Sequence, residues 1–506
     1  MDTRPPQRAS ARLQIVAAIA LTILGVVGFA TQRDTPFFEA IEGPTLDWRF
    51  GLRGPVTPSG KVVMVSIDDR SIAALGGWPL DRKHLAAAID ALSRAGAKVI
   101  ALDLLFTDKG RKAGQPRNSA ADRSLAEAIR RAGRVVVAYG FVFDRAHMVG
   151  SQSIEAIAPA AFARYRIPPD GSPDLLVDPL GLAMPPAILL RAGHPAHVSV
   201  LLDSDGALRR AQPVIGFGDS YYPSLAIEAV RLWMGIKRSA VTVRFGEAIM
   251  LGAQRIDTDR HMRVAVNYYG PEGTLSRYPL ADVLAGKIPA GALRGRVVVI
   301  GASAVGLGDR FVTPYSRTLP GHEHFATHID NILTGRTLAR TGWTTLVDLA
   351  ALIFLGLIGA VIGRIQRPWL AAGTTLLTAG AWGLVALGAF VWARAWLTFT
   401  FPLMTFAAVV AVVAVHRHYV ERLLRRLAER DRSALARFVS PLATDRALAT
   451  GADATDERTI EATIMFVDLR GFTRMSEDMT PEESMRFLRR YHRLQLRPVI
   501  RGANCL

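Results

Sequence analysis

The sequence contains a single cysteine, Cys505, among its 506 residues. No disulfide can therefore form within the chain, even in a part that is exported from the cytoplasm. Acidic side chains are also few, with 44 Asp and Glu against 61 Lys and Arg and a formal charge of +17. The basic excess lies beside apolar runs, and no basic stripe interleaved with aromatic residues occurs elsewhere, so nucleic acid is not an expected partner.

Four apolar runs predict a multi-pass protein of a bacterial-type cytoplasmic (inner) membrane, embedded in the lipid bilayer. Each run is long enough to cross a hydrocarbon core of about 30 Å as a helix. The flanking arginines fit the positive-inside rule with both termini in the cytoplasm. We expect a cytoplasmic segment at residues 1–12 and spans at residues 13–30, 345–363, 369–393 and 396–415. The first run ends in Gly28-Phe29-Ala30, which resembles a signal-peptidase site, so cleavage there stays an alternative.

Residues 31–344 alternate strand and helix signals, which predicts an extracytoplasmic α/β domain. A strand at Lys61–Ile67, a helix at Arg82–Ala95 and a strand at Val99–Phe106 form a βαβ unit. Further strands are expected at Val135–Phe143, His197–Leu202, Ala207–Ile215 and Arg296–Ile300, and a helix from Pro223 to Trp233. The turn residues Asp203-Ser204-Asp205-Gly206 predict a hairpin between two of these strands.

Three acidic residues form the candidate ligand site of this domain. Asp68, Asp69 and Asp103 follow or end predicted strands, and open α/β sheets bind ligands at the carboxyl ends of their strands. The alternative is that these carboxylates only cap helices and order loops. The glycines of residues 301–308 lack the Gly-Lys-Ser/Thr pattern of a phosphate loop and predict a tight turn.

Several short motifs in the same region resemble those of the extracellular CHASE sensor domain of the second type. They are Asp47-Trp48-Arg49-Phe50, Val65-Ser66-Ile67-Asp68-Asp69, Gly77-Trp78-Pro79, Ala95-Gly96-Ala97, Asp103-Leu104-Leu105-Phe106, Asp205-Gly206, Arg209-Arg210, Tyr222-Pro223-Ser224-Leu225-Ala226, Asn267-Tyr268, Gly270-Pro271, Leu293-Arg294-Gly295 and Ile300-Gly301. The resemblance implies a sensor for an unknown extracytoplasmic ligand, placed between one span and a set of three. His322, Glu323, His324 and His328 have a metal-like composition, but Phe325 stands where family members have histidine, which argues against a metal.

Residues 416–458 follow the last run and predict a cytoplasmic signalling helix and linker. The helix at His416–Phe438 carries apolar residues at a coarse three-four spacing, which suits either a parallel coiled coil or a simple amphipathic helix. The segment Arg437-Phe438-Val439-Ser440-Pro441 then resembles the connector that precedes the output domain in many receptor cyclases.

Residues 459–506 contain the output motif. A strand signal at Glu461–Leu469 leads into Asp468-Leu469-Arg470-Gly471-Phe472-Thr473, and Thr480-Pro481-Glu482-Glu483 predicts the capped start of a helix. With Ser476-Glu477, these residues resemble the opening of the α+β (ferredoxin-like) catalytic domain of class III nucleotidyl cyclases.

The resemblance implies a reaction and a site. In that family two carboxylates hold two Mg²⁺ or Mn²⁺ ions, the ribose 3′-hydroxyl of a nucleoside triphosphate attacks the α-phosphorus, and pyrophosphate leaves. Asp468 matches the first metal carboxylate, Leu469 supplies a main-chain carbonyl ligand, and the amides of Gly471, Phe472 and Thr473 would meet the phosphates. The family's sites lie between two catalytic domains, so a homodimer is implied.

The sequence departs from the family after this opening. The second aspartate and the base-reading residues do not follow, and Arg493–Leu506 loses helical periodicity around Pro498 and Gly502. We therefore expect a receptor-type adenylate or guanylate cyclase represented by a truncated, inactive copy. The alternative is a sensor-only membrane signalling protein that dimerises or modulates intact cyclases.

Overall fold

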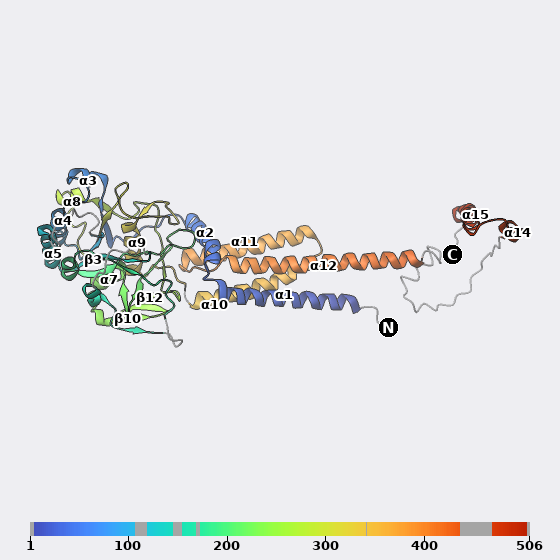
Figure 1. Ribbon diagram of the computed structural model, residues 1–506, viewed down its shortest axis with the longest axis horizontal. Helices are drawn as coiled ribbons and strands as arrows, with labels where there is room; N and C mark the ends of the chain where they lie inside the picture. The colour runs from blue at the N-terminus through green and yellow to red at the C-terminus, as the bar shows by residue number, and fades with distance from the viewer. Residues whose placement is uncertain are drawn as a thin grey trace. The chain divides into compact units, whose positions relative to one another are not determined.

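The computed structural model describes residues 5–106, 119–144, 154–167, 173–340, 342–435 and 468–502. The chain divides into two compact units, one of Ala11–Ala414 and one of Met1–Ser10 with Val415–Leu506. The larger unit contains a mixed α/β domain and apolar helices (Figure 1). The mixed α/β class agrees with the prediction for this part of the chain.

The core of the α/β domain is a seven-stranded, largely parallel sheet. Its order is β14-β1-β15-β2-β3-β6, and β5 pairs antiparallel with β3. The strands are β1 (Val62–Ile67), β2 (Val99–Asp103), β3 (Val135–Val142), β5 (Gly181–Ala183), β6 (His194–His197), β14 (Arg277–Pro279) and β15 (Val297–Ala302). The central strands read as runs of valine and isoleucine because helices cover both faces.

The two faces of the sheet are covered by different helices. The helices α4 (Arg82–Arg94), α5 (Ala120–Ala132), α6 (Ala187–Ala192) and α8 (Leu280–Leu284) pack on one face, and α4 lies beside α5 in Figure 1. The helices α7 (Leu225–Met234) and α9 (Gly321–Thr334) pack on the other. The predicted βαβ unit is present as β1, α4 and β2.

The hairpin predicted across residues 203–206 is wrong. The turn forms, but β6 ends at His197 and pairs parallel with β3, while β7 (Arg210–Ala211) pairs with β13 (Val264–Ala265). Both flanking segments find strand partners elsewhere, so they do not pair with each other. The helix expected from Pro223 begins later, because Pro223 ends β9 (Ser220–Pro223) and the Ser224 hydroxyl caps α7.

A mixed sheet, in which β4 pairs parallel with β10, and two separate strand pairs complete the α/β domain. The first is a four-stranded sheet in the order β12-β11-β10-β4, from β4 (Tyr165–Arg166), β10 (Val241–Arg244), β11 (Ala248–Leu251) and β12 (Gln254–Asp257). The two strand pairs, both antiparallel, are β8 (Val214–Phe217) with β9 and β16 (Arg310–Phe311) with β17 (Leu319–Pro320).

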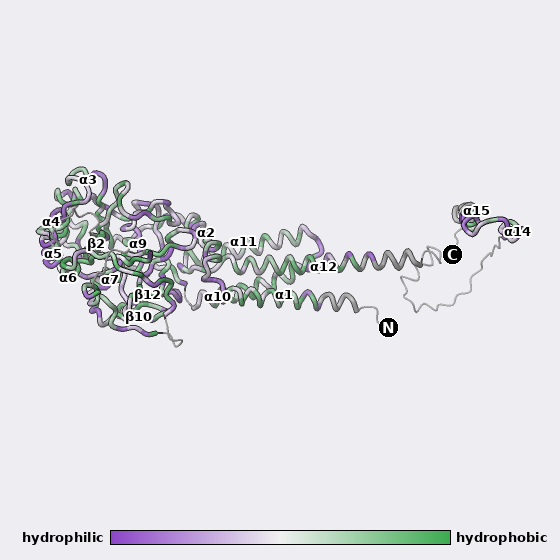
Figure 2. Tube along the Cα trace, in the orientation of Figure 1, coloured by the Kyte–Doolittle hydropathy of each residue, from purple (hydrophilic) through white to green (hydrophobic). Residues whose placement is uncertain are grey.

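Among the described residues, four helices are long and apolar enough to cross a membrane. They are α1 (Pro5–Gln32), α10 (Gly342–Ile362), α11 (Pro368–Trp392) and α12 (Thr400–Leu435), and Figure 2 shows their hydrophobic stretches. The fourth predicted span began at residue 396, whereas α12 begins at Thr400. Residues 396–399 do not join the helix because their backbone groups are hydrogen-bonded to other parts of the chain. A separate helix, α2 (Pro36–Arg53), follows α1.

The described C-terminal residues form two helices, α14 (Phe472–Ser476) and α15 (Pro481–Gly502). The predicted capping box is confirmed, since the Glu483 carboxylate accepts the Thr480 amide at 3.0 Å and the Thr480 hydroxyl accepts the Glu483 amide at 3.4 Å. The sequence loses helical periodicity after Arg493, yet α15 continues through Pro498. The linker and the strand at 461–467 lie outside the described residues.

Candidate functional site

A pocket lies where neighbouring strands send the chain to opposite faces of the sheet. The chain leaves β1 toward α4 on one face, and it leaves the adjacent β15 toward α9 on the other. Connections that part in this way open a crevice at the carboxyl ends of the strands, where open α/β sheets bind ligands. The cavity there has a volume of about 270 Å³.

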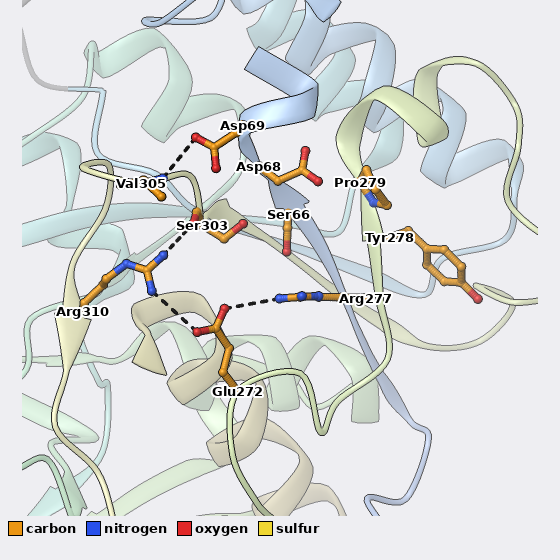
Figure 3. Close-up of a pocket in the computed structure, with 10 residues that line it drawn as sticks. All are labelled: Ser66, Asp68, Asp69, Glu272, Arg277, Tyr278, Pro279, Ser303, Val305 and Arg310. Atoms are coloured by element: carbon orange, nitrogen blue, oxygen red, sulfur yellow. Dashed lines mark hydrogen bonds and ion pairs between the residues drawn. The ribbon is translucent and has the colours of Figure 1, made fainter. Parts of the chain in front are cut away.

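The pocket has two walls of different charge (Figure 3). Asp68 and Asp69 lie on one side, just beyond β1. Arg277, Arg310 and Glu272 lie on the other side. Ser66, Tyr278, Pro279, Ser303 and Val305 complete the lining. The structure therefore brings two of the three predicted acidic residues to one cavity.

The acidic wall also performs the structural role that the alternative predicted. Asp68 Oδ1 accepts the Ser71 amide at 2.8 Å and caps the short helix α3 (Asp69–Ala74). Asp69 Oδ1 accepts the Val305 amide at 3.3 Å. Each hydrogen bond uses one carboxylate oxygen, so capping leaves the other oxygen of each residue available at the pocket.

Asp103 does not line the pocket. Its strand, β2, is separated from β1 by β15, and the Asp103 carboxylate lies against the start of α9 at Gly321. Burial and, secondarily, the nearby Asp309 carboxylate raise the pKa of Asp103 to about 7. The grouping of all three aspartates expected from the sequence is not observed, because a strand from far along the chain inserts between them.

The histidine-rich helix α9 runs beneath the pocket. His322 Nε2 contacts the Ser66 hydroxyl at 3.1 Å, and Glu323 accepts the amide of Gly273, next to Glu272. Burial lowers the pKa of His322 and of His328 to about 4, and it raises the pKa of Glu323 to about 7. Among the described residues, no three His, Cys, Asp or Glu side chains gather closely enough to hold a metal ion.

A second charged cluster, which we call the junction, holds the start of α12. The Glu42 carboxylate, on α2, accepts the amides of Phe399 and Thr400 at 3.0 Å each and the Thr400 hydroxyl at 2.8 Å. Arg49 donates to Glu42 at 2.7 Å and to the carbonyl of Leu397 at 2.9 Å. A carboxylate at a helix N-terminus satisfies free amides and the helix dipole, so α2 fixes where α12 begins.

The same helix α2 is bound to the α/β domain through two adjacent arginines. Arg209 pairs with Asp47 at 2.6 Å, and Arg210 pairs with Glu39 at 2.6 Å. Burial opposes ionisation of Glu39, but Arg210 and Arg263 outweigh it and hold the pKa of Glu39 below its usual value. One helix thus carries ion pairs to the sheet domain and hydrogen bonds to α12.

Sequence reasoning missed the junction and the basic wall of the pocket. Glu42 and Thr400 are 358 positions apart, so no local pattern joins them. Asp47, Arg49, Arg209 and Arg210 were identified only as parts of family motifs, and the structure gives each of them an ion pair.

The predicted nucleotide-binding residues form a tight turn. Asp468 is exposed and its Oδ1 accepts the amide of Leu469 at 2.8 Å, while the Leu469 carbonyl accepts the amide of Phe472 at 3.2 Å. Gly471 has φ +80°, a left-handed conformation that favours glycine, and Thr473 lies in the first turn of α14. The Asp468 carboxylate and the Leu469 carbonyl are two oxygen donors, and Mg²⁺ commonly takes its other ligands from water and substrate phosphates, so the predicted metal site stays a prediction.

The chain thus combines a mixed α/β domain, which has a charged cavity at the carboxyl ends of its strands, with four helices long and apolar enough to cross a membrane. A sequence model of the CHASE2 domain matches residues 17–361, and the chain belongs to this family. The match confirms the predicted sensor domain. No curated protein and no solved structure matched the chain.

Proposed function

We propose that this chain is a membrane receptor in which an extracytoplasmic CHASE2 domain controls a cytoplasmic class III nucleotidyl cyclase domain. The main observation behind the proposal is that the Glu42 carboxylate accepts hydrogen bonds from the backbone amides at the start of α12. This helix is continuous from Thr400 to Leu435, so a shift of α2 moves the start of an element that leads toward the output motif. The predicted bacterial-type inner-membrane location and cytoplasmic termini belong to the same proposal.

A series of contacts within the CHASE2 domain supports transmission from pocket to junction. Ser66 lines the pocket and contacts His322 on α9. Two residues along α9, His324 Nδ1 contacts the Tyr268 hydroxyl at 2.7 Å. The Tyr268 ring packs edge-on against Phe50 of α2, with centroids 6.4 Å apart. Packed elements of this kind can pass a displacement when they have two discrete arrangements.

The cyclase assignment rests on the resemblance of residues 468–473 to the opening of a class III catalytic domain. The resemblance assigns metal binding to Asp468 and Leu469 and phosphate binding to Gly471, Phe472 and Thr473. It also suggests a nucleoside triphosphate substrate, Mg²⁺ or Mn²⁺, and a homodimer.

A chimera tests the proposal directly. Residues 481–506 are replaced by the corresponding and following residues of a class III cyclase, and the purified chain is assayed in nanodiscs with ATP or GTP and Mn²⁺. We expect cyclic nucleotide formation that Asp468→Ala abolishes and that the exposed control Asp478→Asn leaves within about twofold. Glu42→Ala should change the basal rate by at least about threefold. Full activity of the Asp468→Ala chimera would contradict the cyclase role, and an unchanged rate in Glu42→Ala would contradict control through α2.

The sensor-only alternative is equally compatible with the CHASE2 match. In that case the chain would bind its ligand and act on another protein. Co-expression of the 506-residue chain with an intact class III cyclase tests this possibility. A change in cyclic nucleotide level that disappears with Glu42→Ala would support it, and no change would oppose it.

A further inference from the structure

The basic wall of the pocket has donors to spare. Arg277 Nη1 and Arg310 Nη1 lie 3.4 Å and 3.6 Å from the two oxygens of Glu272. Charge-assisted hydrogen bonds between such groups are usually about 2.7–2.9 Å long, so this carboxylate satisfies neither guanidinium fully. A guanidinium has five N–H donors, and a second carboxylate can join without displacing Glu272.

Arg310 is held in place by two backbone carbonyl groups. Its Nη1 donates to the Thr318 carbonyl at 3.0 Å and its Nη2 to the Ser303 carbonyl at 2.8 Å. Arg277 is the freer of the two, because its side chain is 49% exposed and Glu272 is its one ion-pair partner among the described residues. An incoming carboxylate would therefore meet one fixed and one adjustable guanidinium.

The acidic wall faces this basic wall across the cavity. Asp68 and Asp69 each commit one oxygen to a backbone amide, and the remaining oxygens are acceptors for a ligand N–H (Figure 3). A simple anion would be repelled by these carboxylates and by Glu272. A simple cation would leave the spare arginine donors unused.

The cavity volume limits the ligand to a small molecule. At about 30 Å³ per water molecule, 270 Å³ corresponds to roughly nine waters. Drug-sized ligands occupy pockets of roughly 300–1,000 Å³. We propose that the pocket binds a small zwitterion of the α-amino-acid class, with its ammonium group at Asp68 and Asp69 and its carboxylate at Arg277 and Arg310. The inference rests on the proposed sensor function and names the ligand chemistry of that site.

Direct binding to the purified full chain in nanodiscs tests the proposal. Each common L-α-amino acid is titrated singly by calorimetry, and every one that binds is compared with its N-acetyl derivative and its methyl ester. We expect at least one amino acid to bind saturably and both derivatives to bind at least about tenfold more weakly, because each lacks one charge. The absence of any amino-acid binding would overturn the proposal, as would equal affinity for either derivative.

Two variants assign each charge of the ligand to its wall. Arg277→Gln should weaken binding of the amino acid at least about tenfold but leave the methyl ester nearly unchanged. Asp69→Asn should weaken the amino acid similarly but leave the N-acetyl derivative nearly unchanged. The exposed pair Arg255 and Asp257 on β12 supplies matched controls, Arg255→Gln and Asp257→Asn, which should leave affinity within about twofold. If the pocket variants retained full affinity, the amino acid would bind elsewhere and the proposal would fail.

Failure of this proposal is distinguishable from failure of the proposed receptor function. Calorimetry reads the pocket alone and requires no cyclase activity. If no amino acid binds, but Glu42→Ala still changes the cyclase rate of the chimera, only the proposed zwitterion site is wrong. Binding without any effect of the amino acid on the chimera would support the site and contradict the receptor function.

Discussion

The pocket and the junction are both built from arginines and carboxylates, but they pair their charges differently. In the junction, Glu42 and Arg49 are 5% and 1% exposed and lie 2.7 Å apart. In the pocket, Arg277 is half exposed and its pair with Glu272 is 3.4 Å long. The cavity at the junction is about 10 Å³, near the minimum for one water, against about 270 Å³ at the pocket.

This difference separates a structural cluster from a binding cluster. Short, buried pairs use their donors and acceptors completely, so they fix the position of α12 and leave nothing for a ligand. Long, exposed pairs contribute little to stability and keep donors free. Removing one partner of a buried pair leaves an uncompensated charge, whereas removing one partner of an exposed pair leaves a solvated one.

The largest effect is expected at Glu42. Glu42→Ala leaves the Arg49 guanidinium buried without its carboxylate and frees the amides of Phe399 and Thr400. We expect the free energy of unfolding to fall by about 3–5 kcal/mol, measured by urea titration with circular dichroism in detergent micelles. The exposed control Glu247→Ala should change it by less than about 0.5 kcal/mol. A loss at Glu42 no larger than in this control would show that the junction is not a structural cluster.

The next effect is expected at Tyr268, which connects α9 to α2. Its hydroxyl donates to the Leu208 carbonyl at 2.8 Å and contacts His324 Nδ1. Tyr268→Phe keeps the ring packing and leaves both polar atoms unsatisfied, so we expect a loss of about 1–2 kcal/mol in the same titration. Zwitterion affinity should stay within about twofold, since Tyr268 does not line the pocket. A tenfold loss of affinity would show that the two regions are not separate.

A pH-dependent effect is expected at Asp103. Its folded-state pKa of about 7 lies above its ordinary value near 4, so the folded chain retains a proton that the unfolded chain has released. The contribution of Asp103 to stability therefore falls as pH rises from about 4 to about 7 and is constant above.

Asp103→Asn tests this titration. At pH 8 the free energy of unfolding of the variant should exceed that of the wild type by roughly 1–2 kcal/mol. The expected gain is reduced because the Asp103 side chain keeps some exposure, and the gain should vanish below about pH 4. Unfolding titrations at both pH values measure it. Unchanged zwitterion affinity would confirm that Asp103 lies outside the pocket, and a pH-independent difference would contradict the titration.

Local patterns were sufficient for the central elements of the fold. The valine-rich runs and the periodicity of residues 82–95 predicted β1, β2, β3, β15 and α4 close to their observed bounds. The order of the strands could not be read in the same way, because β14 and β15 enter beside β1 from more than two hundred positions away. The erroneous hairpin has the same cause, since β6 is paired by β3 and β7 by β13.

The candidate site was predictable in part. The rule that ligands bind at the carboxyl ends of strands located Asp68 and Asp69 correctly at a cavity. The rule failed for Asp103 because β1 and β2 follow one another in the sequence but are separated by β15 in the sheet. Arg277, Arg310 and Glu272 carry no local motif, and only the fold brings them opposite the acidic wall.

The smallest effect on stability is expected at Glu272, and it is the sharpest test of the comparison. Glu272→Gln removes the charge from two long ion pairs whose carboxylate is 32% exposed. Solvent screens such pairs, so the free energy of unfolding should change by less than about 0.5 kcal/mol, against several kcal/mol at Glu42. The same substitution frees both guanidinium groups from a competing carboxylate, so affinity for the zwitterion should rise about two- to fivefold. A fall of more than about 2 kcal/mol in the free energy of unfolding would instead show that the pocket is a structural cluster like the junction. Its charges would then stabilise the fold and would not be available to a ligand.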